Sequence, residues 1–288
     1  MAHETFRAGN LRAVIGDNEA YQGHRAGYNG VHHLIHRTNP KSLFTVAGLN
    51  LEHIFDGDQD LRGDTKILFE PRNFPMTLTK ISDSEAELHQ EETPTFHLES
   101  WTRFKIVAPH YINVTFRCKP CQHVFKHGYI GLFWASYIDA PENKSIYFRD
   151  DKGWVQLCAQ THSNQSTVVP VDNKIELKFT PETREMLYKN FSPLRFSDPL
   201  YYGLFGTHQY ILMFDRADGI RFAHSPSAGG PPSATEVAWD WQFIIPTYDV
   251  LREYGYRARV VYRERCSRAE VLKEFRTWRA ALEKEPRG

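Results

Sequence analysis

Short runs in which apolar and polar residues alternate make up most of this chain. The clearest is residues 95–106, where the even-numbered positions are mostly apolar and the odd-numbered ones include Glu99, Trp101 and Arg103. A period of two is typical of a β-strand, because successive side chains point to opposite faces. We therefore predict an antiparallel strand whose apolar face lies in the core and whose other face is exposed to solvent or lines a groove.

Further strands are predicted where β-branched, aromatic or aliphatic runs are bounded by Gly, Pro, Asn, Asp or Ser. These segments are residues 11–17, 31–36, 66–70, 76–81, 85–90, 111–117, 128–138, 145–148, 154–158, 174–179, 209–214 and 220–224. The run 128–138 is the longest apolar one and is typical of a buried central strand. Residues 209–214 and 220–224 flank an Asp/Gly turn at 215–219, a pattern that predicts a β-hairpin.

Helix signals are scarce. Ser267 and Glu270 have the spacing of a capping box, and apolar residues recur at helical spacing over 271–282. Together they predict one long helix at about 267–283 that docks on the outside of a sheet. A shorter helix is expected to begin at Thr180, because a proline follows at the first helical position, and to end near Phe191.

These elements predict a mainly β protein. We expect an antiparallel β-sandwich that forms a single domain over residues 1–288, with the C-terminal helix docked on it. All-β domains of this length occur as single units. An aromatic content of 14%, against 41% hydrophobic residues overall, suits broad β surfaces better than a helical bundle.

Charge and composition narrow the function classes. Lys plus Arg and Asp plus Glu balance at 35 each and no segment concentrates the basic residues, which argues against a nucleic-acid partner. No apolar run is long enough to span a bilayer, so no membrane association is expected. The N-terminus lacks the pattern of a secretory signal, which makes the cytoplasm the expected location. Four cysteines are too few for a disulfide framework, and a homo-oligomer is left open.

The stretch from residue 201 to 243 gathers aromatic, titratable and hydrogen-bonding residues around a Ser/Gly/Pro loop. It contains Tyr201, His208, Arg221, His224, Trp239, Asp240 and Trp241. Such a mixture is typical of a sugar site, where aromatic rings stack on the sugar and polar groups bind its hydroxyls. On the alternative interpretation, Asp240 caps a strand beside core aromatics and the stretch is structural.

A second candidate site lies at residues 47–58. If this segment is a regular strand, Glu52 and His53 point to opposite faces and cannot act together. If it is an irregular loop, Glu52, His53, Asp56 and Asp58 converge, and a carboxylate beside an imidazole can transfer protons or bind a cation. A divalent cation held by Glu52, Asp56 or a histidine is one variant, and a solvated polar loop is the structural alternative.

Two other segments with metal-ligand residues are not expected to bind metal. Only Gln122 separates Cys121 from His123, so the chain cannot turn round an ion, and a turn with reduced thiols is predicted instead. His32 and His36 share one face of a predicted strand but lie roughly 13 Å apart by strand rise, too far to share one ion.

A nearly all-β chain of this size, with a strand-loop-strand start and a C-terminal helix, resembles the galactose mutarotase-like (aldose 1-epimerase-like) supersandwich superfamily. The resemblance is one of layout over most of the chain. In that family a histidine and a glutamate exchange protons with the ring oxygen and anomeric hydroxyl of a sugar, and relatives include glycosidases and polysaccharide lyases. The resemblance places the family's histidine near residues 133–137, which contain none, and its glutamate near Asp240. These departures argue against plain mutarotation but not against sugar binding.

These observations predict a carbohydrate-active enzyme of epimerase, glycosidase or lyase type in which a histidine and a carboxylate move protons. The candidate bases are Asp240 and Glu52, and the candidate acids are His208, His224 and His53. The candidate sugar contacts are Arg221, Trp239, Trp241, Trp134, Arg103 and Tyr201. Two alternatives stay open: a non-catalytic carbohydrate-binding protein, and a structural protein whose exposed aromatic residues form an interface.

Overall fold

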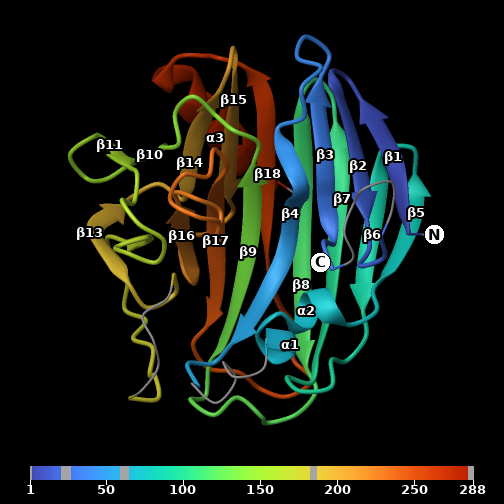
Figure 1. Cartoon of the computed structure of the whole chain (residues 1–288), viewed down its shortest axis with the longest axis vertical. Coiled ribbons are helices and arrows are strands. Elements are labelled where there is room, and N and C mark those ends of the chain that lie inside the picture. The colour runs from blue at the N-terminus through green and yellow to red at the C-terminus, as the bar shows by residue number, and fades with distance from the viewer. Residues whose placement is uncertain (1, 21–26, 59–64, 182–186, 285–288) are drawn as a thin grey trace.

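Two large β-sheets pack face to face in the computed structural model, which describes residues 2–20, 27–58, 65–181 and 187–284 (Figure 1). In spatial order, the first sheet contains β1 (His3–Ala8), β2 (Leu11–Gly16), β3 (Gly30–His36), β4 (Phe44–Phe55), β9 (Ile130–Ile138), β17 (Val237–Ile245), β16 (Ile220–Ser225), β12 (Thr167–Pro170) and β13 (Phe191–Phe196). The second contains β11 (Trp154–Leu157), β10 (Ile146–Arg149), β14 (Leu200–Phe205), β15 (His208–Phe214), β18 (Tyr254–Glu264), β8 (Tyr111–Pro120), β7 (Leu98–Val107), β6 (Glu85–Gln90) and β5 (Thr77–Ser82). Their pairing is predominantly antiparallel, which confirms the predicted β-sandwich.

Large apolar and aromatic side chains fill the space between the sheets. In β17, Trp239 and Trp241 point into this core, whereas Ala238 and Asp240 at the alternate positions point to the outer face of the first sheet. The indole rings of Trp134 and Trp241 stack with centroids 5.4 Å apart and planes only 4° from parallel. Much of the aromatic content of the chain therefore stabilises the core.

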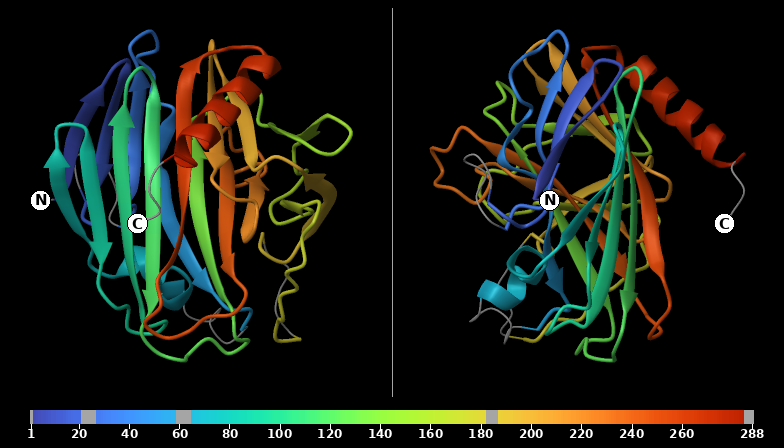
Figure 2. Two further views of the ribbon diagram at one scale, coloured as in Figure 1. Left: turned by 180° about the vertical axis from the view of Figure 1, so that it is seen from behind. Right: turned by 90° about the vertical axis from the view of Figure 1, so that its right-hand side faces the viewer.

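The helix α3 (Arg268–Leu282) covers the outer face of the second sheet (Figure 2). Ser267 caps it, and reciprocal bonds with Glu270 complete a capping box. Its apolar stripe, which includes Phe275 and Trp278, is buried against β15 and β18. Both the cap and the docking agree with the sequence prediction. In the part of the chain that the structure describes, no helix is long and apolar enough to cross a membrane.

The predicted hairpin at 209–224 is wrong. β15 pairs with β14 and β18 in the second sheet, whereas β16 pairs with β17 and β12 in the first, so the turn at 215–219 carries the chain from one sheet to the other. An Asp/Gly turn is compatible with a hairpin within one sheet and with a connection between two sheets. Because β15 and β16 are buried along their whole length, their sequences carry no alternation that would assign them to a common sheet.

Residues 66–70, predicted to be a strand, are helical. The two short helices here are α1 (Thr65–Leu68) and α2 (Glu70–Asn73). Pro71 lies in the first turn of α2, where its fixed φ favours a helix. The buried carboxylate of Glu70 accepts hydrogen bonds from the backbone N–H groups of Thr95 (2.6 Å) and Phe96 (3.1 Å), which fixes the helix to the second sheet's side of the molecule.

The predicted strand at 174–179 has no regular secondary structure. Its alternate residues Ile175, Leu177 and Phe179 pack on an apolar cluster on the outer face of the first sheet, and this contact explains their spacing. The predicted helix from Thr180 to about Phe191 falls partly on 182–186, which lies outside the described residues; residues 187–189 form a turn, and Phe191 begins β13.

Candidate functional site

A cavity of about 640 Å³ opens on the outer face of the first sheet, beside the two short helices. Its walls come from β4, β9, β16 and β17, from α1 and α2, and from loops. The polar side chains around it include Glu52, His53, Arg72, Tyr137, His162, Ser225 and Asp240, and the aromatic ones are Tyr28, Phe69, Phe133, Tyr137 and Tyr188. A cavity of this size, lined by aromatic rings and a few polar groups, is typical of small-ligand sites.

A β-bulge in β4 brings Glu52 and His53 together. Leu51 pairs with Trp134 and His53 pairs with Phe133, the next residue of β9, so that Glu52 is an extra residue in the ladder. Leu51 packs in the core, and both Glu52 and His53 face the cavity. Neither sequence interpretation of this segment was right, because it is a strand but not a regular one.

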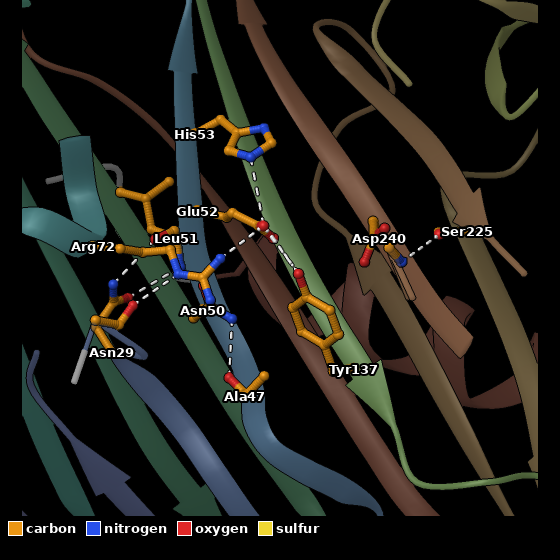
Figure 3. A network of polar contacts seen from close by, with 12 residues as sticks. Asn29, Ala47, Asn50, Leu51, Glu52, His53, Arg72, Tyr137, Ser225 and Asp240 are labelled. Carbon is orange, nitrogen blue, oxygen red and sulfur yellow. Dashed lines mark hydrogen bonds and ion pairs between the residues drawn. The ribbon is translucent and has the colours of Figure 1, made fainter. Parts of the chain in front are cut away.

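Glu52 is the centre of a polar network in the cavity wall (Figure 3). Its Oε1 accepts a hydrogen bond from Nη1 of Arg72 at 2.8 Å, and the Tyr137 hydroxyl lies 3.0 and 3.1 Å from its two oxygens. Burial raises the pKa of Glu52, but His53, Arg72 and Tyr137 outweigh burial and hold the pKa below its ordinary value. Glu52 is therefore ionised at neutral pH, and both of its oxygens are already engaged.

Arg72, which belongs to α2, is held in place by several contacts besides its bond to Glu52. Its Nε donates to the carbonyl oxygen of Gly27 at 2.8 Å, and its guanidinium carbon lies 3.9 Å from the centroid of the Tyr28 ring and 5.2 Å from that of Phe69. Neither Arg72 nor Tyr137 was predicted from the sequence. They lie 20 and 85 residues from Glu52 in the chain, and neither belongs to a motif.

His53 is the cavity residue with the most unused hydrogen-bonding capacity. Its Nε2 lies 3.5 Å from Oε1 of Glu52, close enough for an ion pair when the ring is protonated. Both ring nitrogens are buried, and neither has a hydrogen-bond partner among the residues described. The ring packs against Phe69 and Phe133, with centroids 4.5 and 5.2 Å away. His53 is therefore held in place by packing, with the Glu52 carboxylate within ion-pairing distance.

Asp240 lies on the β17 side of the cavity. It is 1% exposed, and its Oδ1 accepts a hydrogen bond from the backbone N–H of Ser136 at 2.8 Å. Burial raises the pKa of Asp240 well above its ordinary value, and the negative charge of Glu52 raises it further. Two carboxyl groups thus border one cavity with pKa values shifted in opposite directions, an arrangement that separates an acid from a base.

His224 was predicted to act with Asp240, and this prediction is wrong. The residue that pairs with Asp240 is Ala223, so the neighbouring His224 points to the opposite face of the sheet. There its Nε2 donates to the carbonyl oxygen of Lys144 at 2.8 Å, and its Nδ1 accepts from the backbone N–H of Ala159 at 3.3 Å. Burial lowers the pKa of His224 to about 4, so it is a neutral structural residue.

The predicted aromatic platform is also wrong. Trp134, Trp239, Trp241 and Tyr201 are at most 1% exposed and belong to the core between the sheets. The polar atoms of Trp241 and Tyr201 form hydrogen bonds inside the protein. The indole N–H of Trp241 donates to the hydroxyl of Tyr256 at 2.8 Å, and the hydroxyl of Tyr201 donates to the carbonyl oxygen of Trp239 at 2.6 Å. These rings have no face available to a sugar.

His208 and Arg103 belong to the second sheet and lie away from the cavity. The Nε2 of His208 is 3.1 Å from Nδ1 of His36, and this buried pair links the two sheets at one end of the sandwich. Arg103 is on the outer face of β7, where its Nη2 donates to Glu87 at 2.9 Å. Neither is positioned to contact a ligand of Glu52 or Asp240.

Arg221 is on the same face of the first sheet as Asp240 but does not line the cavity. It is 1% exposed beneath the segment 171–181, where its Nη2 donates to the carbonyl oxygen of Ile175 at 3.3 Å. Burial lowers its pKa to about 10.

The proposed cation ligands do not gather at Glu52. The two oxygens of Asp56 accept backbone hydrogen bonds from Asp58 (3.0 Å) and Lys126 (2.6 Å), and the positive charge of Arg72 already balances Glu52. Within the described ranges, neither Glu52 nor Asp56 belongs to a group of three or more potential metal ligands. The donor set at this position therefore does not fit a divalent cation.

No family model and no curated protein matches this sequence. Solved structures do match the fold. A protein of Escherichia coli K12, described provisionally as an aldose 1-epimerase, has a TM-score of 0.57 at 9% sequence identity over 92% of this chain and 99% of its own. A galactose mutarotase-like protein from Lactobacillus casei ATCC 334 has a TM-score of 0.54 at 11% identity over 91% of this chain and 100% of its own. This chain has the galactose mutarotase-like fold.

The same fold covers part of a larger enzyme. A heparan sulfate lyase mutant from Pedobacter heparinus matches with a TM-score of 0.50 at 10% identity, over 92% of this chain and 36% of the lyase. Identities this low show a shared fold alone. The resemblance predicted from the layout of the chain is thereby confirmed, and the galactose mutarotase-like fold is one on which carbohydrate-active enzymes are built.

Proposed function

We propose that this protein is a carbohydrate-active enzyme that carries out acid–base chemistry on a sugar bound in the cavity at Glu52, His53 and Asp240. The observation that carries the proposal is the presence of two buried carboxyl groups with opposite pKa shifts at one cavity, together with His53, whose Nε2 lies 3.5 Å from Glu52. The epimerase-like and lyase-like neighbours of the fold support the substrate class by analogy only.

Each of the three residues has a distinct role in this proposal. Asp240, whose pKa burial raises well above its ordinary value, donates a proton to a sugar oxygen. His53 accepts a proton from the sugar, because its imidazole ring lies in the cavity wall within ion-pairing distance of the Glu52 carboxylate. Glu52 is a positioning residue, since Arg72 and Tyr137 occupy its oxygens while its charge stabilises the protonated His53 ring. A correctly placed pair of this kind contributes roughly 10²–10⁴-fold to a rate.

The aromatic residues of the cavity supply the binding surface in place of the core tryptophans. Phe69, Phe133 and Tyr188 present ring surface to the cavity, on which the apolar face of a sugar can stack. The hydroxyl of Ser225 and the ring of His162, which lie 2.7 Å apart, add polar groups at the rim. Binding and proton transfer therefore use the same cavity.

The test is a sugar panel followed by proton NMR, which detects anomer exchange, epimerisation, hydrolysis and elimination in one experiment. We expect the wild type to turn over at least one sugar, and His53→Ala and Asp240→Asn each to lower the rate by roughly 10²-fold or more. Arg103→Ala is the matched control, because that residue was an equally good candidate from sequence but lies on the other sheet. Sugar binding without turnover would favour the non-catalytic binding protein. Equal rates in all variants would refute the proposed residues.

A further inference from the structure

A second cavity of about 370 Å³ adjoins the first on the far side of Arg72. Gly27, Arg72 and Asn73 line both cavities. The other described residues around the second cavity are Asn18, Glu19, Phe74, Pro75 and Met76. The two cavities therefore form one interrupted groove rather than two separate sites.

The walls of the second cavity are fixed by hydrogen bonds to the chain that follows α2. The side-chain amide of Asn18 donates to the carbonyl oxygens of Pro71 (2.8 Å) and Phe74 (2.7 Å). Gln90 donates to the same two carbonyl oxygens, at 3.0 and 3.2 Å. Because the loop after β2, the strand β6 and the segment 71–74 are tied together in this way, the cavity exists without a ligand, as ligand sites generally do.

Arg72 separates the two cavities, and moving its side chain aside would break several contacts. Its guanidinium is bound to Glu52 on one side and to the carbonyl oxygen of Gly27 on another, and it lies over the ring of Tyr28. A ligand that occupies both cavities must therefore cross over Arg72. The groove runs from β16 to the loop after β2, a distance of five inter-strand spacings of about 4.8 Å, or roughly 24 Å.

The charges in the groove select against an anionic ligand. Among the described residues of the second cavity, Arg72 is the positively charged one, and Glu52 already neutralises it. Glu19 is exposed at the rim and brings a negative charge. Among the described residues of the groove, sulfate or carboxylate groups would meet no unpaired cation, whereas hydroxyl groups can bond to the polar side chains.

We propose that the second cavity is a subsite for a further sugar unit, so that the substrate is an uncharged oligosaccharide of at least two units. The reacting unit lies at His53 and Asp240, and the next unit lies beyond Arg72, against Met76 and Glu19. This inference rests on the proposed function, because it extends the same site.

The test compares affinities along a chain-length series. Isothermal titration calorimetry would measure glucose, galactose and mannose and the neutral disaccharides and trisaccharides of each, using wild type, Met76→Trp and Glu19→Gln. We expect at least one disaccharide to bind the wild type about tenfold more tightly than its monosaccharide. Met76→Trp, which fills the second cavity, should abolish that difference while leaving the monosaccharide affinity unchanged. Glu19→Gln should reduce the difference without any change in bulk, and Arg103→Ala should change neither.

The possible failures are distinguishable. Equal affinity for monosaccharides and oligosaccharides in the wild type, or a chain-length difference that survives in Met76→Trp, would overturn the subsite while leaving the proposed function standing. Tighter binding of sulfated or uronic-acid disaccharides than of neutral ones would overturn the substrate class. The absence of any saccharide binding would overturn the proposed function itself.

Discussion

Replacing Arg72 with methionine tests the network that holds the site together. The substitution removes the 2.8 Å hydrogen bond to Glu52 and the contact with Gly27, and it leaves a carboxylate whose side chain is 7% exposed without its cation. Breaking a buried ion pair from one side costs about 3–5 kcal/mol in the free energy of unfolding. Screening reduces this little, because the Arg72 side chain is itself only 9% exposed. We expect a loss in that range in urea denaturation at pH 7.

Glu52→Gln combined with Arg72→Met is the control, because it removes both charges. The double variant should lose only about 1–2 kcal/mol, since no unpaired buried charge remains. The pH dependence gives an independent check. In the wild type the depressed pKa of Glu52 contributes stability above about pH 4.5, and this contribution is lost as the pH falls. In Arg72→Met one of the groups that lower that pKa is gone, so the pKa of Glu52 should rise and the stability gap to the wild type should narrow on acidification. A double variant as unstable as Arg72→Met, or a gap that widens in acid, would refute the reasoning.

Three further outcomes are expected. Trp241→Phe removes the hydrogen bond to Tyr256 and part of the core, so the free energy of unfolding measured in urea should fall by about 1–3 kcal/mol while sugar affinity stays unchanged. Weaker sugar binding at unchanged stability would contradict the place of Trp241 in the core. Turnover should fall as the pH rises through the elevated pKa of Asp240, because the acid must carry its proton, and initial rates that decline only toward low pH would exclude this role. Burial lowers the pKa of His36 and His208 below the ordinary 6.5, so their contribution to stability is complete above pH 6.5 and is lost as the pH falls below it. The melting temperature should therefore drop on acidification, and it should drop less in His208→Gln.

The elements that sequence predicted well are those with a complete local signal. The residues that cap α3 lie within a few positions of one another, and so do the residues whose alternation predicts β7. Both predictions agree with the structure. β17 shows the limit of this approach. All nine of its residues are buried, so the Trp-Asp-Trp pattern indicates that Asp240 faces away from the two tryptophans but not which face is the core.

The missing parts of the candidate site depend on contacts between distant segments. The bulge that turns Glu52 and His53 to one side is set by the pairing of β4 with β9, about 80 residues further along the chain. Arg72 was overlooked because it lies between the predicted strands 66–70 and 76–81 and belongs to no motif. Glu52 and His53 could be nominated from their chemistry, but their partnership could not be decided from spacing alone.

The use of β17 for two purposes has a consequence for how such a protein diversifies. Asp240 on one face and Trp239 and Trp241 on the other share a single strand, so a shift of its backbone to suit a new substrate would disturb the hydrophobic core at the same time. The described residues on the side of the groove formed by α2 and the loop after β2 do not place large aromatic side chains in the core between the sheets. Variation of ligand preference among descendants, or in a directed-evolution library, should therefore accumulate around residues 73–76, while the sheet beneath stays fixed.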